Sequence, residues 1–185
     1  MSPEVRKLTD SEGRELLVIA RAAIEHRITG RPEHRPVAEA LTPALRAPGA
    51  AFVTLTKAGD LRGCIGTLDF GRPLYQTVAD CALSAALRDP RFDPVRAAEV
   101  PSLHVEVSVL TQPVPVSGPE DIVIGRDGLI VEKGMHRGLL LPQVAVEWGF
   151  DATGFLEATC EKAGLHRDAW RSARLERFEA QIFSE

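Results

Sequence analysis

The segment Leu61–Leu68, with the sequence L-R-G-C-I-G-T-L, brings together residue types that can carry out chemistry. A cysteine thiolate is a nucleophile, and a nearby arginine favours the thiolate over the thiol. Side chains alternate between the two faces of a strand, so Arg62, Cys64 and Gly66 share one face. Gly66 would then leave a notch beside the thiol, which predicts a reactive or ligand-binding cysteine in a glycine-lined groove. The alternative is a core thiol with Arg62 at its rim, because free cysteine is among the most buried residue types.

A second candidate, Glu106, lies in the segment Leu103–Leu110. Four apolar residues there alternate with His104, Glu106 and Ser108, as expected for a strand with two different faces. A carboxylate is costly to bury unless it is paired. We therefore expect Glu106 to orient an arginine such as Arg62 or Arg91, or to act as an acid or base. The alternative is a solvated outer face, which antiparallel sheets often have.

Weaker candidates for ligand contacts are Gly63, Thr67, Arg91, His136 and Gln143. Glycine beside the thiol would let a ligand approach the backbone closely. Three of the others have an ordinary structural alternative: a turn with a salt bridge for Arg91, a surface loop for His136 and a helix cap for Gln143. Cys81 and Cys160 lie in apolar helical patterns and are interpreted as core residues.

Length and composition restrict the class of protein. The chain has 185 residues, 44% of them hydrophobic, and a net charge of -4. These values predict one soluble domain, 1–185, with a small lobe within it. The polar N-terminus and the lack of a long apolar run predict neither a signal peptide nor a membrane span. Three widely spaced cysteines are typical of a cytoplasmic protein without disulfides.

Several well-known functional signatures are absent from the sequence. There is no C-x-x-C, H-E-x-x-H, phosphate-binding loop or G-x-G-x-x-G, and the five histidines are scattered, so we expect no metal site. No cofactor can be named. The acidic net charge argues against a nucleic-acid-binding protein, although arginines gather at 31–35 and at 167–177 around Trp170.

The first half of the chain predicts elements that would position Cys64 and Glu106. Thr9 and Glu12 form a capping box for a helix that Gly30 ends, and an extended connector, 31–49, follows. Residues 51–68 form a hairpin. A turn at Gly59-Asp60 would place Leu55 opposite Cys64 and Val53 opposite Gly66. A helix then runs from Pro73 to Asp89-Pro90.

The second half predicts further strands and helices. Two short strands, 122–124 and 129–132, flank a turn at 125–128, and 139–141 is a buried run. Helices follow from Pro142 to Glu147 and from Asp151 to Gly164, and the alternation around Phe178 predicts a final strand. The pattern favours an α+β fold with an antiparallel sheet flanked by helices.

Together these segments resemble the AMMECR-type domain family from about Phe52 to Glu185, and the first helix resembles it more weakly. The family's signature L-R-G-C-I-G-T matches 61–67, although Leu68 stands where phenylalanine is common. Further matches occur in order at Asp89-Pro90-Arg91-Phe92, at 106–110, at 138–145 and at 162–165 with Trp170.

The resemblance implies a two-lobed α+β fold with the signature segment near a cleft. It also implies that the protein acts with a Memo-type protein and a radical-SAM enzyme, as component A of a three-part system. It implies no particular reaction. Three hypotheses follow: an enzyme or enzyme subunit that uses Cys64, with Arg62 lowering its pKa; a non-catalytic binding or adaptor module; and an RNA-associated module that uses Trp170 and the arginines. The oligomeric state is left open.

Overall fold

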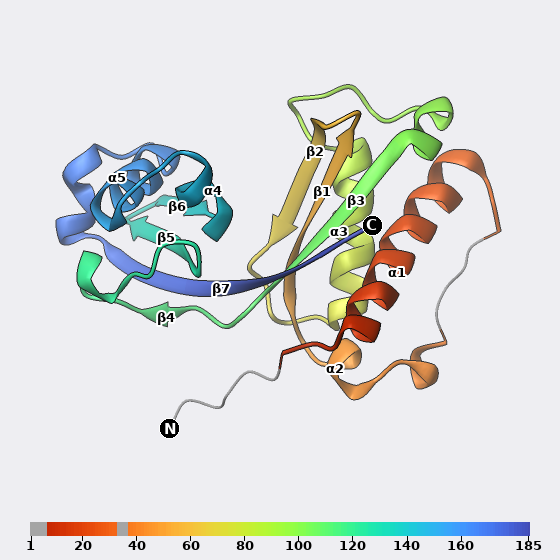
Figure 1. The fold of residues 1–185 in the computed structure, drawn as a ribbon, viewed down its shortest axis with the longest axis horizontal. Coiled ribbons are helices and arrows are strands. Elements are labelled where there is room, and N and C mark those ends of the chain that lie inside the picture. Colours follow the sequence, from red (N-terminus) through yellow and green to blue (C-terminus); the bar gives the residue numbers. More distant parts are fainter. Residues whose placement is uncertain (1–6, 33–36) are drawn as a thin grey trace. The chain divides into compact units, whose positions relative to one another are not determined.

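The computed structural model describes residues 7–32 and 37–185, and it has the expected mixed α+β fold with antiparallel strands flanked by helices (Figure 1). The chain forms two compact units. Unit 1 comprises 1–110 together with 181–185, and unit 2 comprises 111–180. The last strand, β7 (Arg174–Ser184), contributes residues to both units.

Unit 1 is built on the strand order β2-β1-β3, followed by the end of β7. Its strands are β1 (Ala50–Lys57), β2 (Asp60–Thr67) and β3 (Leu103–Leu110). The helices α1 (Asp10–Thr29) and α3 (Leu74–Leu87) share one core with the strands, formed around residues such as Leu16, Val53, Val78 and Val105 (Figure 1). We call this side of the sheet the core face and the other side the open face.

The expected signals at helix ends are confirmed. Thr9 caps α1 with a capping box completed by Glu12, and Gly30 ends it in the left-handed conformation. Pro73 precedes α3, which stops just before Asp89-Pro90. The connector between α1 and β1 is less extended than expected, because it contains a 3-10 turn (Ala38–Ala40) and the short helix α2 (Pro43–Arg46), which begins with a proline. Residues 33–36 of this connector lie outside the described residues.

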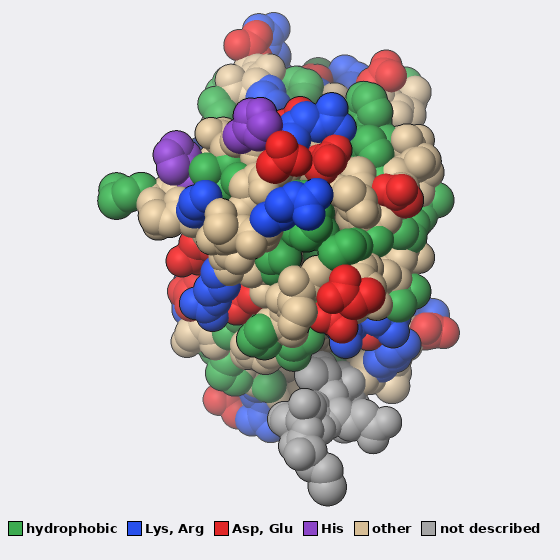
Figure 2. Space-filling view, turned by 90° about the vertical axis from the view of Figure 1, so that its left-hand side faces the viewer, with side chains coloured by type: hydrophobic (Ala, Val, Ile, Leu, Met, Phe, Trp, Pro, Cys, Tyr) green, Lys and Arg blue, Asp and Glu red, His purple; other side chains and the backbone are tan. Residues whose placement is uncertain are grey.

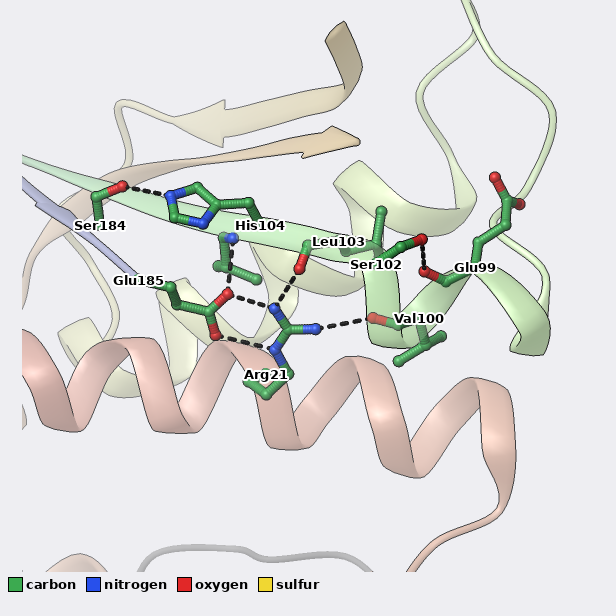
Figure 3. Close-up of polar contacts among 9 residues, drawn as sticks. Arg21, Glu99, Val100, Ser102, Leu103, His104, Ser184 and Glu185 are labelled. Carbon is green, nitrogen blue, oxygen red and sulfur yellow. Dashed lines mark hydrogen bonds and ion pairs between the residues drawn. The ribbon is translucent and has the colours of Figure 1, made fainter. Parts of the chain in front are cut away.

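The end of the chain is bonded to α1 and β3 within unit 1 (Figure 3). Arg21 forms an ion pair with Glu185 and donates hydrogen bonds to the carbonyl oxygens of Val100, at 3.0 Å, and Leu103, at 2.7 Å. The Glu185 carboxylate also accepts a hydrogen bond from the backbone N–H of Val105, at 2.9 Å. One arginine on α1 therefore joins the helix, the start of β3 and the end of the chain.

The predicted hairpin is confirmed, but its predicted register is wrong. Ala58 and Gly59 form the turn, both with positive φ (53° and 90°), which the twist of a two-residue hairpin favours. Asp60 already pairs with Lys57, and an irregularity between Leu55 and Thr56 changes the register by one residue. Thr54, not Leu55, therefore lies opposite Cys64. Because side chains alternate, this one-residue change places Cys64 on the open face instead of among the core residues.

Unit 2 has the strand order β7-β5-β6, with the two-residue strand β4 (Val114–Pro115) also paired to β7. β5 spans Asp127–Lys133 and β6 spans His136–Leu140. The helices α4 (Pro142–Glu147) and α5 (Ala152–Lys162) follow, as predicted, and short 3-10 turns lie at Pro119–Asp121 and Arg167–Ser172. Phe155, Leu156 and Cys160 of α5 pack with Leu129 and Val131 of β5 in a second apolar core.

One predicted hairpin of unit 2 is wrong. Residues 122–124 form no strand, and the hairpin partner of β5 is β6, across a turn at Gly134-Met135. The reason is Asp127, which is fully buried and accepts hydrogen bonds from the Val123 N–H and from the side chains of Arg126 and Arg177. This carboxylate folds 123–127 into a tight loop. His136 consequently begins a strand instead of lying in a loop.

No helix in 7–32 or 37–185 is long and apolar enough to cross a membrane.

Candidate functional site

The register of the strands places Cys64, Thr54 and Glu106 in one row across β2, β1 and β3. Thr54 is the partner of Cys64 on one side and of Glu106 on the other. Directly opposed residues point to the same face, so all three side chains lie on the open face, where each is half-buried. The Thr54 hydroxyl donates a hydrogen bond to the Cys64 sulfur at 3.3 Å. Thr54 was not among the residues singled out from the sequence, because the expected register placed Leu55 there.

The predicted link from Arg62 to the thiol or to Glu106 is replaced by an ion pair with Glu99. Arg62 donates two hydrogen bonds of 3.2 Å to the Glu99 carboxylate, which also accepts one from Lys57 at 3.1 Å. The Arg62 side chain, the backbone N–H of Arg96 and the Lys57 side chain all bond to this carboxylate, and together they lower the pKa of Glu99 to about 2. The guanidinium charge next to the signature cysteine is therefore compensated by a carboxylate outside the segment.

Neighbouring atoms fill the space beside the two glycines near Cys64, Gly63 and Gly66. A Cβ added to Gly63 would lie 2.2 Å from the carbonyl oxygen of Ala85, so glycine lets β2 approach the backbone of α3 closely. A Cβ added to Gly66 would lie 2.2 Å from the Phe52 ring. The expected notch at Gly66 is therefore wrong, because the aromatic ring from β1 fills it.

Asp89 and Arg91 hold the outer edge of β2 at Cys64. The Cys64 N–H donates to Asp89 at 2.8 Å, and Arg91 donates to the Cys64 carbonyl oxygen at 3.4 Å. The carboxylate is only 4% exposed and is bonded by the side chain and backbone N–H of Arg91, which together with the Cys64 N–H hold its pKa well below the usual range. The D-P-R-F segment therefore provides hydrogen-bond partners for the backbone N–H and carbonyl oxygen of Cys64, at an edge of β2 that has no neighbouring strand.

The other candidate residues are spread over both units. In unit 1, the Thr67 hydroxyl accepts a hydrogen bond from the Asp69 N–H at 3.0 Å. In unit 2, a ring nitrogen of His136 lies 3.2 Å from the Ala163 carbonyl oxygen, and the side-chain oxygen of Gln143 is buried without a hydrogen-bond partner among the described residues. The structure therefore brings Cys64 and Glu106 together on one sheet, whereas His136 and Gln143 belong to the other compact unit.

The remaining cysteines lie in the cores. All three cysteines are free thiols, and Cys81 and Cys160 are buried. Burial is the main cause that raises the pKa of Cys81 to about 11, so Cys81 stays a thiol at neutral pH. Within 7–32 and 37–185, no three histidine, cysteine or acidic side chains come together as a metal site.

Arg167, Arg174 and Arg177, which follow α5, are paired with acids, whereas Arg171 is stacked on Trp170. Arg167 bonds to Glu157 at 2.5 Å, and Arg174 bonds to Glu176 at 2.7 Å. Arg171 lies over the Trp170 ring, 4.4 Å from its centroid. Acidic and basic side chains are interspersed over the face shown in Figure 2. Such neutralised arginines give little attraction for a phosphate backbone, which weakens the RNA hypothesis.

The fold and this row of side chains define an α+β protein with a half-buried cysteine on the open face of an antiparallel sheet. The AMMECR1 family model matches residues 17–183, and the chain therefore belongs to the AMMECR1 family. A protein of Methanothermobacter thermautotrophicus is 50% identical over 186 residues, with 96% of each chain covered. A protein of Methanosarcina barkeri is 46% identical, with 96% of this chain and 92% of the relative covered.

A solved structure supports the fold. The crystal structure of an uncharacterized protein from Pyrococcus horikoshii is 43% identical in sequence and matches with a TM-score of 0.90. The match covers 97% of this chain and 94% of that one. These relatives fix the family and the fold, and they name no reaction.

Proposed function

We propose that this protein is a cytoplasmic enzyme subunit that binds a ligand at the LRGCIGT segment and uses the Cys64 thiol. The observation that carries the proposal is the row Cys64–Thr54–Glu106 on one face of the sheet. Nothing in this row is needed to fill the apolar core, since the core residues of β1 are the alternate ones, Val53 and Leu55. A thiol, a hydroxyl and a carboxylate side by side are the parts that nucleophilic or acid–base chemistry requires.

Each residue of the row has a distinct role in this proposal. The Cys64 thiol adds across an electrophilic double bond of the ligand: the sulfur bonds to the electrophilic atom, the π bond breaks, and the thiol proton ends on the atom that takes up the π electrons. Thr54 stabilises the sulfur through its hydroxyl hydrogen bond. Glu106 exchanges a proton with the ligand or orients it. Arg91 and Asp89 fix the strand that carries the thiol, and a fixed thiol is a requirement for reactive geometry.

The remaining parts of the proposal rest on the family resemblance. The whole chain, 1–185, works as one domain. Thr67 in unit 1 and, separately, His136 and Gln143 in unit 2 are candidates for ligand contacts chosen from the sequence. It acts with a Memo-type protein and a radical-SAM enzyme, and it delivers or modifies the molecule on which they act. If the thiol is dispensable, the same face serves as a non-catalytic binding surface.

The test is complementation of a deletion strain, combined with untargeted metabolite profiling. We expect the Cys64→Ser allele to leave the melting temperature nearly unchanged. Both Cys64→Ser and Glu106→Gln should accumulate the same metabolites as the deletion. Thr56→Val and Glu132→Gln are matched controls outside the row and should complement fully. If a folded Cys64→Ser protein restores the wild-type metabolite profile, Cys64 has no catalytic role, and the open face is a binding surface only.

A further inference from the structure

A pocket lies between the end of β2 and one stripe of α3, apart from the Cys64 row. It has a volume of about 220 Å³. Thr77, Asp80, Cys81 and Ser84 of α3 line it, at the spacing of one helical face, opposite Ile65, Gly66 and Thr67. Asp69 and Arg72 from the loop between these elements complete the lining. All of these residues belong to unit 1.

The outer edge of β2 presents unpaired backbone groups to this pocket. The Cys64 N–H and carbonyl oxygen point outward, toward Asp89 and Arg91. Backbone groups two residues apart in a strand point the same way, so the N–H and carbonyl oxygen of Gly66 also point outward. β2 is the end strand of its sheet, and in the described part of the chain no hydrogen-bond partner is found for these two groups. Gly66 is only half-buried and lines the pocket, so a ligand can reach it.

Only about one residue of the outer edge of β2, Gly66, is available for backbone hydrogen bonds to a ligand. Asp89 and Arg91 occupy the edge at Cys64, and the strand ends at Thr67. Paired antiparallel residues can exchange two hydrogen bonds, N–H to O=C in both directions. A molecule the size of one amino acid, with its own donor and acceptor, can therefore pair with Gly66 as a neighbouring strand would, whereas a longer strand would meet Asp89.

The charges in the pocket select for an additional cation. Arg72 forms an ion pair of 2.5 Å with Asp80, whereas no ion pair of Asp69 is found among the described residues. Asp69 is exposed, and one of its oxygens accepts a hydrogen bond from the Gly71 N–H at 2.8 Å. The lining thus has two acids and one base, together with the hydroxyls of Thr67 and Ser84. A ligand with one net positive charge balances it.

We propose that the β2–α3 pocket binds a free basic α-amino acid. The ligand's carboxylate accepts a hydrogen bond from the Gly66 N–H, and its α-ammonium group donates to the Gly66 carbonyl oxygen. Its side-chain ammonium or guanidinium group lies against Asp69. This inference concerns a different face of β2 from the Cys64 thiol and does not depend on the proposed function.

The test is a titration of the full-length ¹⁵N-labelled protein, followed by backbone amide NMR shifts. The probes are L-lysine, L-ornithine and L-arginine. L-glutamate has the opposite side-chain charge, and Nα-acetyl-L-lysine lacks the α-ammonium group. We expect at least one basic amino acid to cause saturable shifts at the amides of Gly66, Thr67 and Ser84, and neither control compound to do so. The Asp69→Asn variant should weaken that binding about tenfold while keeping its hydrogen bond to Gly71, because a charged contact is lost. The matched variant Asp60→Asn, an exposed acid at the far end of the same strand, should bind as the wild type does.

Three results would overturn the proposal. The first is the absence of saturable shifts at these amides with all three basic amino acids up to about 10 mM, a concentration that would nearly saturate a site with a Kd of about 1 mM. The second is equal binding of L-glutamate or Nα-acetyl-L-lysine. The third is unchanged affinity in Asp69→Asn, which would mean that the shifts arise elsewhere. None of these results would bear on Cys64, whose test is complementation.

Discussion

Replacing Asp89 with alanine should destabilise the protein far more than replacing Asp93, an exposed acid four residues away. The Asp89 carboxylate is 4% exposed and accepts the Cys64 N–H at 2.8 Å, so its loss leaves a backbone donor of β2 without an acceptor. A lost hydrogen bond to a buried charged group costs about 1.5–3 kcal/mol. The Arg91 side chain is 52% exposed and regains water, so the ion pair itself adds about 0–1 kcal/mol. The sum is about 1.5–4 kcal/mol for Asp89→Ala.

The measurement is urea unfolding of the purified full-length variants, followed by circular dichroism and tryptophan fluorescence. Asp93→Ala removes an exposed acid from the same segment and should change the free energy of unfolding by no more than about 0.5 kcal/mol. Equal losses for Asp89→Ala and Asp93→Ala would refute the reasoning, since Asp89 would then not hold the edge of β2.

The pH dependence of Asp89→Asn has a defined sign. The pKa of Asp89 is lowered in the folded protein by the Arg91 hydrogen bonds and the Cys64 N–H, so the ionised form stabilises the fold. This contribution is fully present above the unfolded-state pKa, about 3.9, and is lost as the pH falls below it toward the folded pKa. The difference in unfolding free energy between wild type and Asp89→Asn should therefore be constant from neutral pH to about pH 5 and shrink in more acidic solution.

Three further perturbations test other parts of the fold and site. Iodoacetamide should modify Cys64 before Cys81 or Cys160 in the folded protein, because Cys64 is half-buried whereas the other two are 5% and 0% exposed. Peptide mass mapping measures the order of modification. Alkylation of Cys81 or Cys160 before Cys64 would contradict the prediction. Gly63→Ala should cost about 3 kcal/mol, because the new Cβ would lie 2.2 Å from the Ala85 carbonyl oxygen. Gly154→Ala in α5 should cost much less, because its new Cβ would come no closer than 3.3 Å to the Asp151 side chain. Equal chemical-denaturation midpoints would argue against the contact at Gly63. Arg21→Ala should cost about 2–3 kcal/mol through its lost bonds to Val100, Leu103 and Glu185, and Arg14→Ala, at an exposed position of the same helix, should be near neutral.

Local signals in the sequence predicted most elements of unit 1. The Thr9–Glu12 capping box, Gly30 and Pro73 act within a turn of their own positions, so their structural effects follow from nearby residues alone. The alternation from Leu103 to Leu110 also predicted β3 with its bounds. These features persist because tertiary contacts reinforce them.

The errors arose where a residue outside the segment decides the outcome. The segment 122–124 is apolar enough for a strand, but the buried Asp127 draws the Val123 N–H into a tight loop. Arg62 pairs with Glu99, 37 residues away, and the Phe52 ring covers Gly66 from the neighbouring strand. Neither partner could be chosen from spacing, because the hairpin register had to be known first, and a single added residue in β2 altered it.

That register can itself be tested with an engineered disulfide. The Cys64 N–H and carbonyl oxygen bond to Asp89 and Arg91 at the outer edge, so Cys64 and Thr54 form a pair without mutual backbone hydrogen bonds. The Cα atoms of such pairs are about 4.5 Å apart, which is within the range that a disulfide spans. Thr54→Cys should therefore oxidise to a disulfide with Cys64, seen as the loss of two hydrogens by intact mass and as protection of both residues from alkylation.

Leu55→Cys is the matched control, because the register expected from the sequence would place it opposite Cys64. In the structure Leu55 is the partner of Gly63 and its side chain lies in the core, on the other side of the sheet from Cys64. It should remain reduced under the same conditions. A disulfide in Leu55→Cys without one in Thr54→Cys would show that the register expected from the sequence is the true one. Cys64 would then lie in the core, and the row of side chains on which the proposed function rests would not exist.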